Sequence, residues 1–448
     1  MAGPGFFTPP AADRYALRRV RIPKSLLAAP QADPRQHEDF TTCDVVIENG
    51  RIADVAPAGS VDPGLGPDLD ASIVLPGLID AHAHLDKGHI WRRSPNLSGD
   101  GRGAALATTA DRSANWTAED VRRRMSFGLA TAYAKGVAAI RTHLDSLAPQ
   151  ASITFPVFRA LREEWAGRIE LQASTIGPID IFMSDAGREL ADIVAESQGN
   201  LGCGSRFVQP LPEIVPLELD IAYNNLFALA EERGLDIDLH VDESGDIEAR
   251  ALIRIARIAL KRGFKGRILC GHCCALALQT DELIDETLKA CREAGIDIVS
   301  LPSVNLYLQG RTTRRTPKWR GVTLLHEMKA HGLKVAIAGD NVRDPFHAYG
   351  DHDMLDTYTQ AVRILHLDHP FDDWITSVTT MPAAIMGLEG KGRIARGAAA
   401  DLLVLRARDY GEMIARFQAD RVVIRAGRAI DTTLPDYRQL DDIPGLAP

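Results

Sequence analysis

The sequence predicts an α/β fold, a TIM-like (β/α)8 barrel joined by a small β-sandwich that both chain ends build. Short β-rich runs alternate with helix-like segments from about residue 78 to residue 340, which is typical of a parallel sheet with helical crossovers. About eight such runs in about 260 residues match the usual size of a closed barrel. Residues 40–75 and 398–431 instead carry short alternating apolar runs that end at glycine.

The predicted barrel strands begin with LIDAHAH (78–84) and end with LKVAIAGD (333–340). Between them we expect VAAIRTHLD (137–145), RIELQASTI (168–176), SRFVQPL (205–211), LDIDLHVDE (235–243), RILCGH (267–272) and IDIVSLP (296–302). The intervening segments are helix-like, and YNNLFALAEERG ends at Gly234, a typical helix stop.

The two chain ends are each too short to form a stable β domain alone. We therefore expect residues 1–75 and 385–448 to pair as one small β-sandwich domain, and residues 76–384 to form the catalytic barrel. The alternative is two independent β-hairpin appendages.

Composition excludes several classes of partner. The chain has 448 residues, 45% of them hydrophobic and 25% charged, with a net charge of -9, so we expect neither nucleic acid nor a membrane as partner. No apolar run reaches the roughly 18 residues of a membrane span, and the N-terminus lacks the pattern of a secretory signal. We therefore expect a cytoplasmic protein whose six cysteines are mostly small core residues.

His82 and His84 lie two residues apart at the end of the first predicted strand. Residues i and i+2 of a strand point to the same side, about 6–7 Å apart. Both imidazoles can therefore reach a single metal ion. The alternative is a pair of strand-end histidines bonded to water or backbone.

Other strand ends carry similar side chains. His240 ends the fifth predicted strand and is followed by Asp242 and Glu243, His272 ends the sixth, and Asp340 ends the eighth. Because active sites of such barrels lie at the C-terminal ends of the strands, we expect these side chains to converge.

Several motifs then resemble one family. They are HAH (82–84), RTHLD (141–145), HVDE (240–243), VNLYLQGR (304–311), PKWRG (317–321) and GDNVRDPF (339–346). Together they resemble the amidohydrolase superfamily and, more narrowly, the cytosine deaminase-like family, from about residue 40 to residue 430.

The resemblance implies one divalent metal ion, zinc or iron, held by His82, His84, His240 and Asp340. Glu243 would be the acid/base, and His272 and Asp340 would accept a proton from the attacking water and orient it. Members with two metals carry a lysine on strand four, but SRFVQPL has none and Lys87 follows strand one. We therefore expect a single metal.

The implied activity is metal-dependent hydrolytic deamination, in which a ring C–NH2 of a cytosine-like pyrimidine or pterin becomes C=O and ammonia leaves. The alternatives are an aminotriazine or cyclic-amide amidohydrolase and, more remotely, a non-catalytic metal- and ligand-binding barrel. The implied partner is a small heterocyclic substrate, and because the family often forms oligomers, a homo-oligomer is implied as well.

Three departures from the cytosine deaminase pattern concern the substrate. Asn341 replaces an aspartate, Phe346 replaces a tryptophan, and TIGPIDIF (175–182) lacks a glutamine. We therefore expect a ring larger or more acidic than cytosine. The predicted substrate-binding residues are Asn341, Phe346, Ile179, Gln309, Arg311 and Trp91. The loop after strand one also contains Arg92, Arg93, Arg102 and Arg112, which form either an anion clamp or a solvated basic loop.

Overall fold

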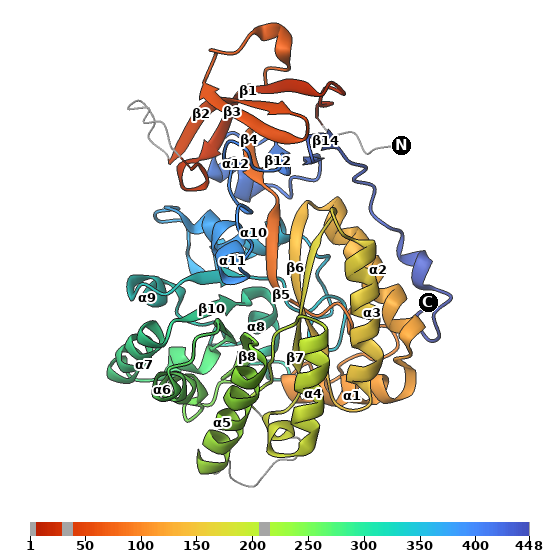
Figure 1. Ribbon diagram of the computed structural model, residues 1–448, viewed down its shortest axis with the longest axis vertical. Coiled ribbons are helices and arrows are strands. Elements are labelled where there is room, and N and C mark those ends of the chain that lie inside the picture. The colour runs from red at the N-terminus through yellow and green to blue at the C-terminus, as the bar shows by residue number, and fades with distance from the viewer. Residues whose placement is uncertain (1–5, 29–38, 206–215, 448) are drawn as a thin grey trace. The chain divides into compact units, whose positions relative to one another are not determined.

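The structure is a computed structural model that describes residues 6–28, 39–205 and 216–447 (Figure 1). Its internal contacts divide the chain into two compact units. The first comprises residues 1–80, 130–139 and 352–435, and the second comprises residues 81–129, 140–351 and 436–448. The domain boundaries expected from the sequence stay a prediction.

The first unit is organised around a seven-stranded sheet that contains strands from both chain ends. In sheet order the strands are β14 (Arg428–Ala429), β13 (Val422–Arg425), β12 (Leu402–Leu405), β4 (Ile73–Pro76), β1 (Arg14–Pro23), β2 (Phe40–Glu48) and β3 (Arg51–Pro57). β12 pairs with β4 in the antiparallel direction, with Leu402 opposite Pro76. The predicted pairing of the two ends is thus confirmed.

Short helices complete this unit. They are η1 (Lys24–Leu26), η2 (Pro63–Leu65), α10 (Met354–Leu365), η5 (Trp374–Val378), α11 (Thr380–Ile385) and α12 (Tyr410–Ala415). Asp353 caps α10 by accepting a hydrogen bond from the backbone of Leu355 at 3.1 Å. Its carboxylate is also held by both terminal nitrogens of Arg421 at 2.8 Å, so the start of α10 is fixed by a buried ion pair.

The barrel strands form two sheets. One has the order β5 (Leu78–Ala83), β6 (Val137–Asp145) and β7 (Glu170–Ile176), and the other has the order β11 (Val335–Ile337), β10 (Ile296–Ser300), β9 (Ile268–His272) and β8 (Ile237–Val241). The strands from β8 to β11 are parallel neighbours, with Val241 opposite His272 and Ser300 opposite Ile337.

Single bridges join the two sheets into a ring. Asn200 and Leu201 make parallel bridges to Ser174 of the β7 strand and Ile237 of the β8 strand. On the other side, a parallel bridge links Ala83 to Asp340. This arrangement confirms the predicted barrel. Its fourth strand was predicted at 205–211, of which residues 206–211 lie outside the described part of the chain, and the bridges place the connecting segment at residues 200–204.

Helices follow the strands, and Figure 1 shows α2 to α7 beside them. They are α1 (Gly101–Asn115), α2 (Ala118–Ala134), α3 (Gln150–Glu164), η3 (Ile179–Met183), α4 (Asp185–Glu196), α5 (Pro216–Arg233), α6 (Ala251–Arg262), η4 (Cys274–Leu278), α7 (Asp281–Ala294), α8 (Pro302–Leu308), α9 (Leu325–Ala330) and η6 (Tyr437–Leu440). α5 ends at the predicted stop, where Gly234 has a φ of 63° that favours glycine.

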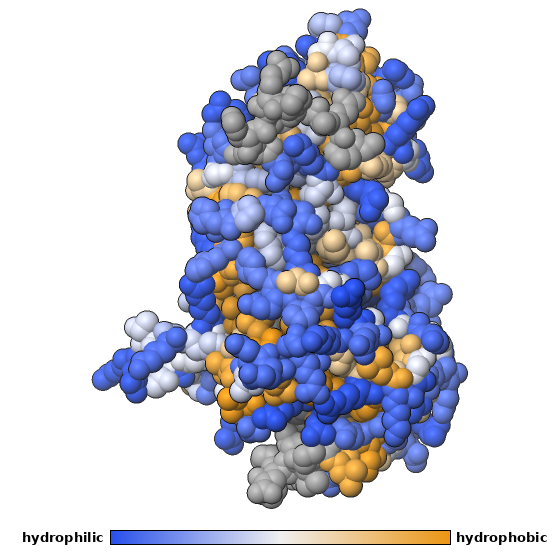
Figure 2. Space-filling model, turned by 90° about the vertical axis from the view of Figure 1, so that its left-hand side faces the viewer, coloured by the Kyte–Doolittle hydropathy of each residue, from blue (hydrophilic) through white to orange (hydrophobic). Residues whose placement is uncertain are grey.

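The core and the surface agree with the composition. All six cysteines are free and buried, which confirms them as core residues. Hydrophilic residues cover most of the face seen in Figure 2, with hydrophobic groups exposed between them. Such exposure is ordinary for folded proteins. Among the described helices, none is both long and apolar enough to cross a membrane.

Candidate metal centre and active site

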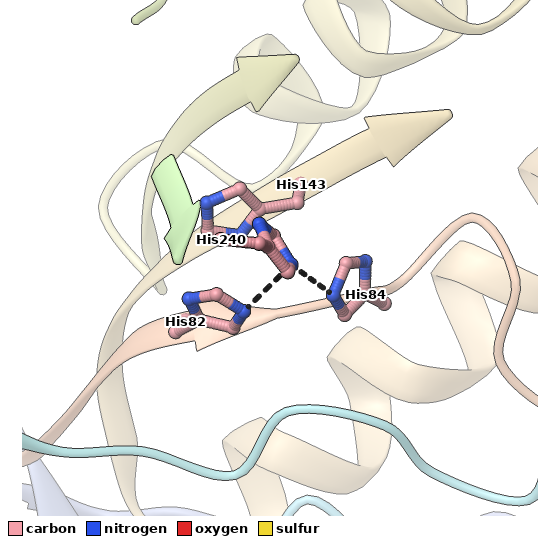
Figure 3. A group of neighbouring side chains, drawn as sticks. All are labelled: His82, His84, His143 and His240. Atoms are coloured by element: carbon pink, nitrogen blue, oxygen red, sulfur yellow. Dashed lines mark hydrogen bonds between the residues drawn. The ribbon is translucent and has the colours of Figure 1, made fainter. Parts of the chain in front are cut away.

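Three of the predicted metal ligands, His82, His84 and His240, lie together in the second unit, at the ends of β5 and β8 (Figure 3). The fourth, Asp340, follows β11 and can join a metal-binding group with His82. His240 Nε2 is 3.1 Å from His82 Nε2 and 3.2 Å from His84 Nε2. Asp340 Oδ1 is 3.3 Å from His84 Nε2 and 3.7 Å from His82 Nε2. Asp340 Oδ1 therefore lies within 4 Å of two of the three ring nitrogens.

These spacings fit a divalent ion. Ligands placed tetrahedrally about 2.1 Å from a zinc ion stand about 3.4 Å from each other, close to the separations between these atoms. Imidazole nitrogen and carboxylate oxygen are ligands that both zinc and iron accept. His82, His84 and Asp340 are at most 3% exposed, and such buried polar groups need a partner of this kind.

The electrostatics of the histidines also suit a metal. Desolvation and the neighbouring imidazoles, foremost His143, hold the pKa of His82 and His240 well below the usual value. Desolvation and then Lys87 do the same to the pKa of His84. All three rings are therefore neutral near pH 7, which is the form that binds metal.

The backbone of the site includes residues in unusual conformations. Asp340 N donates to His82 O at 2.8 Å, and His84 N donates to Asp340 O at 3.2 Å, so β5 and the end of β11 are locked together. Asp340 has a φ of 62°, and His272 has a φ of 68°. A positive φ is uncommon for side chains other than glycine and clusters at functional sites.

Glu243 and His272, the predicted proton carriers, lie beside this cluster. His272 Nδ1 is 3.5 Å from Glu243 Oε1, and the His272 ring centroid is 5.3 Å from that of His82 and 5.0 Å from that of His240. Glu243 is partly exposed, with 23% of its side chain accessible. A carboxyl group that solvent can reach beside a buried cluster can exchange protons with a bound molecule.

His143 is a member of the cluster that the sequence analysis did not assign to the site. Its ring centroid is 4.0 Å from that of His82, and it can join a metal-binding group with His82. Its Nε2 is 3.1 Å from Asp238 Oδ1, while Arg141 and Ser174 donate to Asp238 Oδ2. Burial raises the pKa of Asp238, but His143 and Arg141 outweigh it and lower that pKa. The sequence indication for His143 was its place in the motif RTHLD.

Lys87 and its partners form a second group of buried charges. Lys87 Nζ is 3.0 Å from Asp145 Oδ1, and Arg112 Nη1 is 3.0 Å from Asp145 Oδ2. Burial, followed by the charge of Asp145, raises the pKa of Asp86 to about 7. Lys87 is thus engaged with carboxylates, in keeping with its predicted lack of a metal-bridging role.

The predicted substrate-binding residues occupy different environments. Asn341 is 3% exposed and donates to Asp344 Oδ2 at 2.6 Å. Phe346 lies with its ring centroid 5.1 Å from Lys87 Nζ. Ile179 is buried at the start of η3, Gln309 and Trp91 are half-buried, and Arg311 is exposed with its guanidinium over the ring of Tyr307. Their contact with substrate stays a prediction.

Two of the four loop arginines make ion pairs with buried carboxylates. Arg93 makes ion pairs with Asp111 at 2.8 Å and Asp120 at 2.7 Å, and its side chain is 5% exposed. Arg112 is paired with Asp145. Arg93 and Arg112 are therefore already paired with carboxylates of the same unit, and contact of the loop arginines with substrate stays a prediction.

Comparison with known proteins identifies the family. A sequence model of the amidohydrolase family matches residues 179–431. The chain belongs to the amidohydrolase family. It is 46% identical over 442 residues to a pterin deaminase of Rhizobium rhizogenes, covering 98% of this chain and 99% of that protein.

Further amidohydrolases are more distant. The N-isopropylammelide isopropyl amidohydrolase of Pseudomonas sp. is 25% identical over 411 residues, covering 88% of this chain and 94% of that protein. The crystal structure of 5-methylcytosine deaminase from Klebsiella pneumoniae, liganded with 5-fluorocytosine, superposes with a TM-score of 0.78 at 25% identity. It covers 93% of this chain and 97% of its own. The predicted resemblance is confirmed, and this amidohydrolase is a hydrolase acting on C–N bonds.

Proposed function

We propose that this amidohydrolase is a metal-dependent deaminase of pterin-like heterocycles, which converts a ring C–NH2 to C=O and releases ammonia. The observation that carries the proposal is the 46% identity to a pterin deaminase over almost the full length of both chains. The juxtaposition of Glu243 and His272 with a buried histidine–aspartate cluster supports it independently.

We assign one divalent ion, zinc or iron, to His82, His84, His240 and Asp340. When bound, the ion lowers the pKa of a water molecule toward neutrality. Asp340 would accept a proton from the water that adds to the ring carbon. His272, which lies in one group of close polar side chains with His82 and Asp340, would orient the adding oxygen.

Glu243 carries the proton on the substrate side. Its carboxyl group gives a proton to the ring nitrogen next to the C–NH2 carbon while the oxygen adds. A tetrahedral carbon forms, and a proton delivered to its amino group lets ammonia leave. Because Glu243 lies 3.5 Å from the His272 ring, both side chains can serve the same reacting carbon.

An ammonia-release assay tests this proposal. The enzyme, loaded separately with zinc and with iron, is given 2-amino-4-oxopteridine, cytosine and an aminotriazine, and hydrolysis of a cyclic amide is followed in parallel. We expect the highest kcat/KM for the pteridine. Ring opening of the cyclic amide, without ammonia release from any aminated ring, would show that the reaction class is wrong.

A further inference from the structure

Asn305 lies in the motif VNLYLQGR (304–311), and the proposed chemistry has not yet given Asn305 a part. Its side-chain Nδ2 is 2.9 Å from Nδ1 of His272, across 33 positions of sequence. Asn305 is completely buried and His272 is 1% exposed. The contact is therefore a short polar one, shielded from water, between a strand end and a helix.

The helix α8 holds Asn305 rigidly in this place. Pro302 occupies the first turn of α8, where its missing N–H costs nothing. The backbone N–H of Asn305 donates to Leu301 O at 2.9 Å, and Asn305 O accepts from Gln309 N at 2.9 Å. A Cβ at Gly321 would lie 2.9 Å from Asn305 O, so the segment after the helix packs tightly against it as well.

We propose that Asn305 is a positioning residue, which holds His272 in the neutral tautomer that carries its proton on Nε2. The amide nitrogen of asparagine can only donate, so the nitrogen that it faces must accept. A neutral imidazole that accepts at Nδ1 carries its proton at Nε2. His272 then presents an N–H donor from Nε2.

The same contact separates the roles of Glu243 and His272. Glu243 Oε1 lies 3.5 Å from His272 Nδ1, so a proton on Nδ1 would be donated to Glu243 and would tie up this carboxylate. With Asn305 donating to Nδ1, Glu243 keeps its oxygen for the ring nitrogen of the substrate. This consequence rests on the proposed deaminase function, whereas the tautomer does not.

The tautomer also determines the part played by His272. From the family resemblance we expected His272 to accept a proton from water. In the tautomer set by Asn305, His272 donates from Nε2 to the oxygen that adds to the ring carbon, and Asp340 remains as the acceptor. A fixed donor aimed at developing negative charge stabilises the transition state more than the ground state.

The first test is spectroscopic and needs no substrate. In the zinc-loaded enzyme with ¹⁵N-labelled histidine, nitrogen shifts distinguish a protonated ring nitrogen from an unprotonated one, and His272→Gln identifies the signals of His272. We expect the proton on Nε2 in the parent and on Nδ1 in Asn305→Asp, whose carboxylate can only accept. A proton on Nδ1 of His272 in the parent would overturn the proposal, whether or not any variant folds.

The second test is kinetic. Asn305→Asp should lower kcat by at least about 100-fold, and Asn305→Leu by about 10-fold, with KM within about threefold of the parent, since indirect partners of this kind typically contribute 10–100-fold. If Asn305 were merely structural, kcat would instead fall equally in both variants, and both would also lose metal. Zinc content and circular dichroism are measured for each protein.

Asn224→Asp is the matched control. Asn224 lies half-buried on α5, where its amide donates to Asp220 O and faces Arg262, so the variant gains the same charge away from the cluster. We expect its kcat to equal that of the parent. A parent that fails to deaminate the pteridine would contradict the proposed function and leave the tautomer measurement to decide the role of Asn305.

Discussion

At the scale of single residues, Glu243 lies 3.5 Å from the His272 ring with its carboxyl group reachable from solvent. Glu243→Gln keeps the shape of the side chain and removes its ability to transfer protons. We expect kcat to fall by about 10²–10⁴-fold, the usual contribution of a positioned acid/base, with metal content unchanged. Steady-state kinetics measures this, and Glu248→Gln, an exposed position of the same loop, should match the parent. Turnover within about threefold in Glu243→Gln would exclude the assigned role.

His82 is a proposed metal ligand with a completely buried side chain. His82→Ala removes one of the four proposed donors, a ring nitrogen 3.1 Å from that of His240. We expect the purified variant to lose most of its zinc or iron, as measured by elemental analysis. His331→Ala, which removes a histidine paired with Asp285 on the surface of the second unit, should retain the ion. Full metal occupancy in His82→Ala would contradict the assignment of His82 as a ligand.

We also expect single side chains to determine selectivity between heterocycles. Asn341 donates to Asp344 and is buried, so its hydrogen-bonding pattern differs from that of an aspartate at the same position. A buried polar group that loses its hydrogen-bond partner costs roughly 1–3 kcal/mol of free energy. Two such mismatches between cytosine and this pocket would lower kcat/KM for cytosine by about a thousandfold. We expect cytosine to be this much poorer than 2-amino-4-oxopteridine in a steady-state comparison. Cytosine with the highest kcat/KM would show that these substitutions do not govern selectivity.

At the scale of elements, the segment from residue 436 to residue 447 packs against α2 within the second unit. Phe127, Leu440, Ile443 and Leu446 form a buried apolar cluster. The segment also contacts the loops that follow β5 and β11, since Arg92 donates to Leu446 O at 3.0 Å and Tyr437 donates to Asp351 at 3.1 Å. The last residues of the chain thus brace two loops that carry predicted site residues.

Ile443→Ala tests this bracing. Ile443 is 2% exposed, and removing three buried carbons leaves a cavity that costs about 2–5 kcal/mol of unfolding free energy. Urea unfolding should show this loss, together with a raised KM, because both braced loops loosen. Leu434→Ala, at a position 43% exposed, should change stability by less than about 0.5 kcal/mol. Equal urea midpoints for the two variants would mean that the terminal segment does not stabilise its unit.

At the scale of the whole molecule, one buried histidine of the first unit, His352, links stability to pH. Burial lowers the pKa of His352 to about 4, against about 6.5 in an unfolded chain. The unfolded state therefore binds the proton more readily, and the stabilisation present above pH 6.5 is lost as pH falls toward 4. The difference corresponds to roughly 3 kcal/mol at most.

Comparison of His352→Asn with the parent isolates this contribution. Asparagine tolerates the positive φ of 50° at this position. We expect the urea midpoint of the parent to fall more steeply between pH 7.5 and pH 4.5 than that of the variant, because all other histidines are shared. Parallel pH profiles would contradict the assigned role of His352.

Several features of this protein follow from the sequence alone. VAAIRTHLD was predicted as a strand at 137–145 and forms β6 over the same residues, and the HxH pair lies at the end of β5 with both rings turned to one side (Figure 3). Such features are local, because alternation along a strand and glycine at a helix end depend on neighbouring residues only. They are sufficient to predict the barrel and which of its strand ends carry the histidines and carboxylates of the candidate site.

Other features depend on contacts between distant segments, which one sequence does not specify. The link between β7 and β8 comes from single bridges at residues 200–204, too short for an alternating pattern. Arg93 and Arg112 have the appearance of a basic loop in the sequence, but the folded unit brings Asp111, Asp120 and Asp145 to them. His143 and Asn305 likewise acquire their roles from side chains that only the closed barrel brings within 3.1 Å. The physical reason is that desolvated ion pairs and buried hydrogen bonds are set by packing in three dimensions, and neither periodicity nor spacing along the chain records that packing.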